Sequence, residues 1–220
     1  MKLIQQRGFT LVELLVALAL NIVVLVALVS IFVANLQHYR IMLNTNRLYQ
    51  QLHSAMDMMS TDIRRAGSWV NARNDLGLDQ NNNPFMASGA DITIGSPNSC
   101  ILFTYDHNKT GTLPAISSSS DDDRYGYRLN GQVLQARPWG AAFSCAASAA
   151  SWENMTDSSF MQVTALSFTL TTQTITTGPG TAGIQLRSVD ITLTGRLASD
   201  ATVTKTLTEH IRIRNDVFIP

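Results

Sequence analysis

Charge is scarce in this 220-residue sequence, and neither sign dominates. Sixteen Lys and Arg residues balance sixteen Asp and Glu residues, and charged residues make up only 15% of the chain. Proteins that bind nucleic acids gain affinity by neutralising phosphates with positive charge. The balance therefore argues against nucleic acid as a partner. The basic ending His210–Asn215 alternates Ile211 and Ile213 with polar residues, which favours an edge strand over a DNA-binding surface.

Catalytic and metal-binding motifs are also missing from the sequence. It contains no H-E-x-x-H, no G-x-S-x-G and no P-loop. A literal G-x-G-x-x-G match at Gly178–Gly183 lies between two threonine-rich segments and opens no helix, so we interpret it as a hairpin loop. Four histidines lack the spacing of metal ligands: His38, His53, His107 and His210. We expect no enzyme, no cofactor and no metal. The alternative hypothesis is an enzyme in the periplasm that is anchored to the membrane by one helix. It requires a cleft in which titratable side chains are clustered.

Cysteine occurs only twice, at Cys100 and Cys145. The composition beyond the N-terminal segment, polar and rich in small residues, is typical of a β-rich exported domain. In such a domain an even pair of cysteines suggests one disulfide. In the alternative, both cysteines are buried free thiols.

A long apolar run occupies the N-terminal part of the chain. From Phe9 to Ala34 the polar exceptions are few: Thr10, Glu13, Asn21 and Ser30. A helix of this length reaches about 39 Å, more than the ~30 Å of a bilayer's hydrocarbon core. The apolar region of a cleaved secretory signal is shorter and ends in a small-residue site. The run therefore predicts a transmembrane helix over residues 9–34. An ordinary anchor leaves Glu13 unexplained, because a charge deep in the membrane costs about 2.5–3.5 kcal/mol.

The start of this run carries a specific motif. Gly8-Phe9-Thr10-Leu11-Val12-Glu13, followed by an apolar helix, resembles the N-terminus of type IV prepilins and type II secretion pseudopilins. The resemblance implies a leader of residues 1–8, removed by prepilin peptidase between Gly8 and Phe9, and methylation of the new Phe9 amine. It also implies that Glu13 meets the N-terminus of a neighbouring subunit during assembly. In the alternative, Glu13 snorkels to the membrane surface.

Two other segments narrow the resemblance. Met58–Gly67, which ends in Asp62-Ile63-Arg64-Arg65-Ala66-Gly67, is similar to the helix ending of PilW-type minor pilins. Ile211–Asn215 resembles a strand near their C-termini. The resemblance implies a minor pilin that helps prime assembly of a type IV pilus and is incorporated in it. The alternative is a minor pseudopilin of a type II secretion system.

The resemblance also implies partners and a location. The partners are the prepilin peptidase, other minor pilins, the major pilin and the inner-membrane assembly platform. We expect a single pass through the inner membrane with the domain 35–220 in the periplasm, and later a place in the pilus at the cell surface.

Beyond Ala34 the apolar residues recur every three to five positions and form one stripe: Leu36, Tyr39, Leu43, Leu48, Leu52, Met56, Met59 and Ile63. Gly67, preceded by Arg64 and Arg65, supplies a C-terminal stop. We therefore expect one helix from Phe9 to Ala66, whose amphipathic part, residues 35–66, packs on the domain.

Polar segments follow the helix. Ser68–Pro84 is predicted to be a loop, and within it Asp79–Asn83 faintly resembles a calcium loop but lacks the glycine at the sixth position. Ser117–Asp123 is predicted to be a solvated loop. Neither segment alters the expectation of no metal site.

Strand patterns fill residues 85–220. Asn130-Gly131 predicts a hairpin, and the alternation slips near Arg187-Ser188, which indicates a bulge. The fold class predicted is α+β and type IV pilin-like: one long N-terminal helix packed on a C-terminal antiparallel sheet. The expected strands are Asp91–Ile94, Ile101–Tyr105, Tyr125–Leu129, Gln132–Ala136, Val163–Thr172, Ile184–Leu197 and Val203–Ile213.

Overall fold

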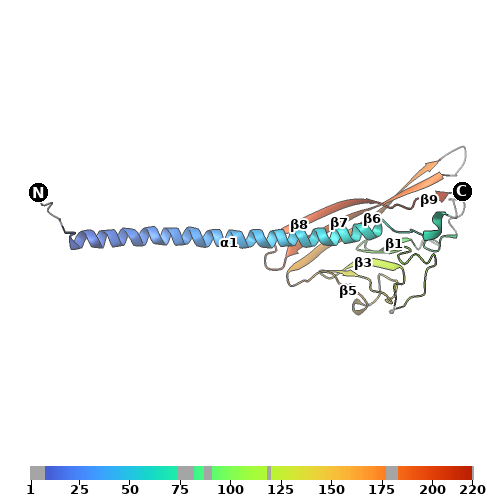
Figure 1. Ribbon diagram of the computed structural model, residues 1–220, viewed down its shortest axis with the longest axis horizontal. Helices are drawn as coiled ribbons and strands as arrows, with labels where there is room; N and C mark the ends of the chain where they lie inside the picture. Colours follow the sequence, from blue (N-terminus) through green and yellow to red (C-terminus); the bar gives the residue numbers. More distant parts are fainter. Residues whose placement is uncertain (1–7, 74–81, 87–90, 118–119, 177–182, 220) are drawn as a thin grey trace, which may run out of the picture. The chain divides into compact units, whose positions relative to one another are not determined.

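The computed structural model describes residues 8–73, 82–86, 91–117, 120–176 and 183–219. The chain divides into two compact units, Met1–Asn46 and Arg47–Pro220, which are described separately. One helix, α1 (Leu11–Ile63), runs through the boundary between them (Figure 1).

The first unit is an exposed apolar helix. α1 contains a segment long and apolar enough to cross a membrane. Every described residue from Gly8 to Asn44 is exposed, including the large apolar side chains between Leu11 and Val33. Such a surface is stable in hydrocarbon and unfavourable in water. The predicted stripe is wrong in its first part, because Leu36, Tyr39 and Leu43 are exposed and burial begins at Leu48.

The second unit holds two antiparallel sheets, where the sequence analysis predicted a single sheet. Its described residues also include the 3₁₀ helices η1 (Val70–Arg73) and η4 (Ala149–Ser151). The first sheet has the order β1 (Ile92–Gly95), β2 (Cys100–Thr104), β3 (Arg124–Asn130), β4 (Val133–Ala136) and β5 (Glu153–Asn154). The second has the order β6 (Met161–Thr176), β7 (Gly183–Leu197) and β8 (Thr204–Arg212), with β9 (Val217–Ile219) also paired to β7.

Hydrogen bonds join β6 to loops of the first sheet. The N–H of Val163 donates to the Gln132 carbonyl at 2.9 Å, and the N–H of Phe168 donates to the Asn98 carbonyl at 2.8 Å. These contacts involve the turns that precede β2 and β4, so they do not extend one ladder into the other. The antiparallel strands are thus two sheets that share one core.

The core lies where residues Arg47–Ile63 of α1 pack on both sheets (Figure 1). Leu48, Leu52, Met59 and Ile63 are fully buried, and apolar side chains of β2, β6 and β7 meet them: Phe103, Phe168, Ile191 and Leu193. A Cβ added at Gly195 would lie 2.9 Å from Leu52 Cδ2, so the glycine lets the helix approach β7 closely. The α+β class and the pilin-like arrangement of helix and sheets are confirmed.

The end of α1 is fixed by distant parts of the chain. The helix ends at Ile63, three residues before the predicted Ala66, and Gly67 follows with φ +73°. The Asn215 side chain donates to the Ala66 carbonyl at 2.9 Å, and the Gly67 N–H donates to the Thr104 carbonyl at 2.8 Å. The last turn therefore opens to meet β2 and the C-terminal segment.

Asp62 ties this last turn to the first sheet. Its carboxylate accepts hydrogen bonds from the hydroxyls of Tyr127, at 2.6 Å, and Tyr105, at 3.3 Å. Burial raises the pKa of Tyr105 to about 12, and the nearby Asp62 charge adds to this effect. Burial and the Asp62 charge likewise raise the pKa of Tyr127. Both phenols are therefore donors at neutral pH.

The hairpin prediction is confirmed and the bulge prediction is wrong. Asn130 pairs with Val133, and Gly131 between them has φ +61°. The register of β7 continues through Arg187, and the shift in pairing lies on β6 between Val163 and Ala165. The alternation slips at Arg187 because this residue occupies a core-facing position, where its guanidinium pairs with buried Asp91.

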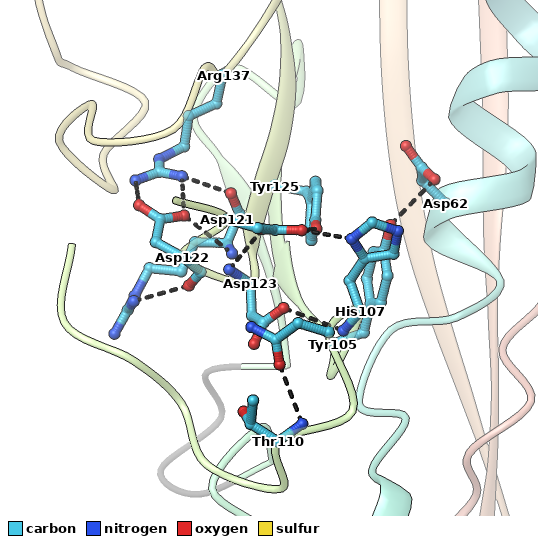
Figure 2. Close-up of polar contacts among 11 residues, drawn as sticks. Asp62, Tyr105, His107, Thr110, Asp121, Asp122, Asp123, Tyr125 and Arg137 are labelled. Carbon is cyan, nitrogen blue, oxygen red and sulfur yellow. Dashed lines mark hydrogen bonds and ion pairs between the residues drawn. The ribbon is translucent and has the colours of Figure 1, made fainter. Parts of the chain in front are cut away.

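The loop predicted at Ser117–Asp123 is solvated only in part where it is described: Ser120 is exposed, and Ser117 and Asp121 are half-buried. Asp122 and Asp123 are fully buried. Arg137 donates to both oxygens of Asp122, at 2.8 and 2.6 Å, and both side chains are inaccessible (Figure 2). A buried carboxylate is tolerated when it is paired in this way.

Two other predicted loops fall partly outside the described residues. Of Asp79–Asn83, only Asn82 and Asn83 are described, and Asn83 is structural: its side chain donates to Gly67 and accepts from the Phe85 N–H. Of Gly178–Gly183, only Gly183 is described, and it begins β7.

Candidate functional site at the start of the long helix

The helix begins with three hydrogen bonds between Thr10 and Glu13. Thr10 precedes the first helical residue, and its hydroxyl oxygen accepts from the Glu13 N–H at 3.3 Å. The Glu13 carboxylate in turn accepts from the Thr10 N–H at 2.9 Å and from the Thr10 hydroxyl at 3.0 Å. This arrangement is a capping box.

The capping box gives Glu13 a local role. The first N–H groups of a helix lack intrahelical partners, and in hydrocarbon each unsatisfied group costs several kcal/mol. A carboxylate at a helix start also interacts favourably with the helix dipole. Glu13 therefore stabilises the beginning of α1 inside its own chain. The sequence analysis missed this role, although the spacing Thr10-x-x-Glu13 is its usual signal.

The Glu13 carboxylate is hydrogen-bonded to Thr10. None of the ion pairs among the described residues includes Glu13. Its negative charge therefore stays uncompensated within the described part of the chain. A cation from outside that part would find an ordered carboxylate held in place by Thr10.

Gly8 and Phe9 lie before the helix. Phe9 is 89% exposed, and a Cβ added at Gly8 would meet no atom within 4 Å. The first intrahelical hydrogen bond runs from the Leu14 N–H to the Thr10 carbonyl, at 3.2 Å, so the Gly8–Phe9 peptide is not part of the helical ladder. An enzyme can reach this bond without unwinding a turn. The rest of the predicted leader, residues 1–7, lies outside the described residues.

The two cysteines form a disulfide in the second unit. Cys100 begins β2, and its Cα lies 6.0 Å from that of Cys145. Arg128 holds the loop that carries Cys145, because its guanidinium donates to the carbonyls of Cys145, at 2.9 Å, and Ala147, at 2.7 Å. The same guanidinium lies 4.4 Å from the ring centroid of Trp152. The disulfide and Arg128 together fasten this loop to the first sheet.

The site residues that the sequence analysis predicted do not form one common site. The second unit holds the cysteines and the first holds Gly8, Phe9 and Glu13, so these are separate features. Within the described residues no group of three or more His, Cys, Asp or Glu side chains is arranged to hold a metal.

Comparison with protein families matches both parts of the chain. A family model described as prepilin peptidase-dependent protein B matches residues 41–213. A second, described as the prokaryotic N-terminal methylation motif, matches residues 4–34. No curated protein and no solved structure matches the chain. The first match covers more than half of the chain, and the second covers Gly8, Phe9 and Glu13.

Proposed function

The chain belongs to the prepilin peptidase-dependent protein B family, and from this membership we propose that it is a minor pilin. As such it helps prime assembly of a type IV pilus and is then incorporated in it. The observation that carries the proposal is the sequence Gly8–Glu13 at the head of an exposed apolar helix. The PilW-like segments Met58–Gly67 and Ile211–Asn215 support a pilus over a type II secretion system, whose minor pseudopilins are the alternative.

We propose that processing precedes assembly. Prepilin peptidase cleaves between Gly8 and Phe9 and methylates the Phe9 amine. Cleavage leaves 220 − 8 = 212 residues and removes Lys2 and Arg7, so the mature side chains sum to 14 − 16 = −2. Until it enters the pilus the mature chain spans the inner membrane once, with residues 35–220 in the periplasm.

Glu13 then selects the assembled state. Attraction between opposite charges is strong where water is excluded, so a carboxylate in hydrocarbon favours any state that offers it a cation. The methylated Phe9 amine of a neighbouring subunit is such a cation. The partners are thus other minor pilins and the major pilin, on the inner-membrane assembly platform.

Glu13→Gln tests this role. Glutamine can replace glutamate in a capping box, so the change removes the charge while keeping the helix start. Removing one partner of a desolvated ion pair commonly costs about 3–5 kcal/mol, enough to lower occupancy more than a hundredfold. We expect normal cleavage and membrane insertion, loss of the subunit from sheared filaments, and fewer pili per cell.

Thr10→Val is the matched control. It removes the capping hydroxyl, worth about 1 kcal/mol, and keeps the Glu13 charge. We expect nearly normal pilus numbers. Intact-mass analysis checks that each variant is cut after Gly8 and carries one methyl group. Wild-type pilus numbers in Glu13→Gln, with the variant present in filaments, would exclude the pairing role. If deletion of the subunit abolishes protein secretion and spares pili, the pseudopilin alternative holds instead.

A further inference from the structure

A loop between β2 and β3 has the spacing of the first six positions of a calcium loop, although Ser117 stands where such a loop has its glutamate. Asp106-His107-Asn108-Lys109-Thr110-Gly111 places oxygen-bearing side chains at positions one, three and five and a glycine at position six. Asp106 Oδ2 accepts from the N–H groups of Gly111, at 3.2 Å, and Val70, at 2.9 Å. Gly111 has φ +75°, a conformation in which a residue with a side chain would be strained. The side chain of the first loop residue, Asp106, is therefore bonded to the backbone of the sixth, Gly111.

Two buried carboxylate oxygens at this loop lack hydrogen-bond partners among the described residues. They are Asp106 Oδ1 and Asp123 Oδ2. Asp106 is only 8% exposed and Asp123 is fully buried. Desolvating a charged oxygen without a partner is unfavourable, and buried charges in proteins are normally paired or bound to a metal. These two oxygens are therefore candidate ligands for a cation.

Asp123 is attached to the loop by its other oxygen. Its Oδ1 accepts from the His107 N–H at 3.0 Å (Figure 2). The Gly111 N–H holds Asp106 Oδ2 and the His107 N–H holds Asp123 Oδ1, so both carboxylates are fixed at the same loop, where one cation can bind both.

Asp121 is hydrogen-bonded to residues at or next to the candidate ligands. It accepts from the Tyr125 hydroxyl, at 2.6 Å, the Asp123 N–H, at 2.9 Å, and His107 Nδ1 (Figure 2). Its oxygens are therefore already bonded, and His107 Nδ1 is bonded too. The groups left for a cation at this loop are oxygens.

We propose that the loop Asp106–Thr112 and Asp123 form a calcium site. Asp106 Oδ1 and Asp123 Oδ2 supply the charge. The Asn108 side-chain oxygen and the Thr112 carbonyl, which each accept one hydrogen bond from Thr110, supply neutral ligands, and water supplies the rest. An all-oxygen site of this kind suits Ca²⁺, which takes six to eight oxygen ligands.

The chemistry predicts weak binding. Only two carboxylates carry charge in the site. Calcium affinity is lower when fewer ligands are charged, so the dissociation constant should be about 0.1–1 mM. Asn108, Lys109 and Thr110 are exposed, so the ion can enter from solvent. Calcium would then stabilise the junction between Val70, the loop and the start of β3.

Thermal unfolding of the chelator-treated mature chain in detergent tests the site. We expect Ca²⁺ at 10 mM to raise Tm by about 3–8 °C, and Mg²⁺ at equal ionic strength to do much less. Asp106→Asn and Asp123→Asn should lose this shift. Asp157→Asn, which alters an exposed carboxylate, should keep it. Without calcium, Asp123→Asn should be at least as stable as the wild type, because it removes a buried unpaired charge.

Terbium luminescence gives a readout that needs no variant. Tb³⁺ binds calcium sites and emits when an aromatic side chain beside it is excited. Trp69 donates to the Gly111 carbonyl at 2.8 Å, and Tyr105 adjoins Asp106, so both can sensitise it. We expect emission that millimolar Ca²⁺ abolishes and Mg²⁺ does not. Emission that calcium leaves unchanged, no calcium shift in the wild type, or an undiminished shift in both Asn variants would each overturn the proposal.

Discussion

At the scale of single residues, the second unit is distinguished by buried arginines. Arg137 and Asp122 are both inaccessible, and Arg187 and Asp91 nearly so. The two charges of such a pair are expensive to desolvate, so the pair adds little net stability compared with apolar residues of the same size. Either charge left alone is strongly unfavourable. These pairs therefore select one arrangement of the loops that carry Asp91 and Asp122.

Arg137→Met should be severely destabilising for this reason. It leaves the Asp122 carboxylate buried without its guanidinium, and we expect a loss of about 3–5 kcal/mol in the free energy of unfolding. Arg212→Met is the matched control, because Arg212 and Asp216 form an exposed i,i+4 pair, which contributes about 1 kcal/mol or less. Denaturant unfolding of the purified chain measures both. Equal losses would mean that Asp122 regains water in the Arg137 variant.

At the scale of elements, α1 consists of an exposed part followed by a part that is buried on one side. Up to Asn44 all its described residues are exposed, whereas Leu48, Leu52, Met59 and Ile63 are fully buried. Apolar residues recur at the same spacing in the exposed part and in the buried part. A helix face that contacts lipid and one that contacts a protein core therefore have the same sequence pattern. The hydrophobic pattern therefore predicts the helix but not the residue at which its packing begins.

Leu52→Ala and Leu36→Ala measure where packing begins. Leu52 is fully buried beside Gly195, and the alanine leaves a cavity, so we expect a loss of about 2–5 kcal/mol in the stability of the second unit. Leu36 is 44% exposed, and the same change there should alter stability by less than about 0.5 kcal/mol. Thermal and denaturant unfolding give both values. Similar losses in the two variants would show that the packed part of α1 extends back to Leu36.

The sequence predicts those features of these elements that depend on contacts between residues close together in the chain. The helix, the hairpin at Gly131 and most strands arise from local periodicity and turn residues. The end of α1 at Ile63 depends on Asn215, which lies 149 residues from its partner Ala66. Arg187 was misread as a bulge because Asp91, which explains it, is also distant. Contacts of this kind leave no local pattern.

At the scale of the whole molecule, the candidate site and the fold were predictable to different degrees. Gly8, Phe9 and Glu13 form a contiguous motif, so the sequence alone indicates them. Thr10 was overlooked because the membrane signal dominates its surroundings. The loop Asp106–Gly111 was overlooked because its second carboxylate, Asp123, was assigned to a solvated loop. Its burial depends on how the strands pair, which the local composition of that segment does not encode.

The disulfide links the stability of the second unit to the compartment in which it folds. Disulfides persist in oxidising compartments, so the Cys100–Cys145 bond forms if the second unit is exported. Its cysteines are 45 residues apart, and the chain-entropy model assigns such a link about 4 kcal/mol. Reduction should lower the free energy of unfolding by roughly this amount without unfolding the domain, because Arg128 still holds the loop.

Thiol labelling of the chain from cells, together with denaturant unfolding, tests this prediction. Without reductant we expect no labelled cysteine, and after reduction we expect two. A double variant, Cys100→Ala with Cys145→Ala, is the control, since reductant should leave its stability unchanged. Its stability should also equal that of the reduced wild type, because both lack the same cross-link. Two reactive thiols in the freshly extracted chain, with no effect of reductant on stability, would contradict both the disulfide and the periplasmic location that we propose.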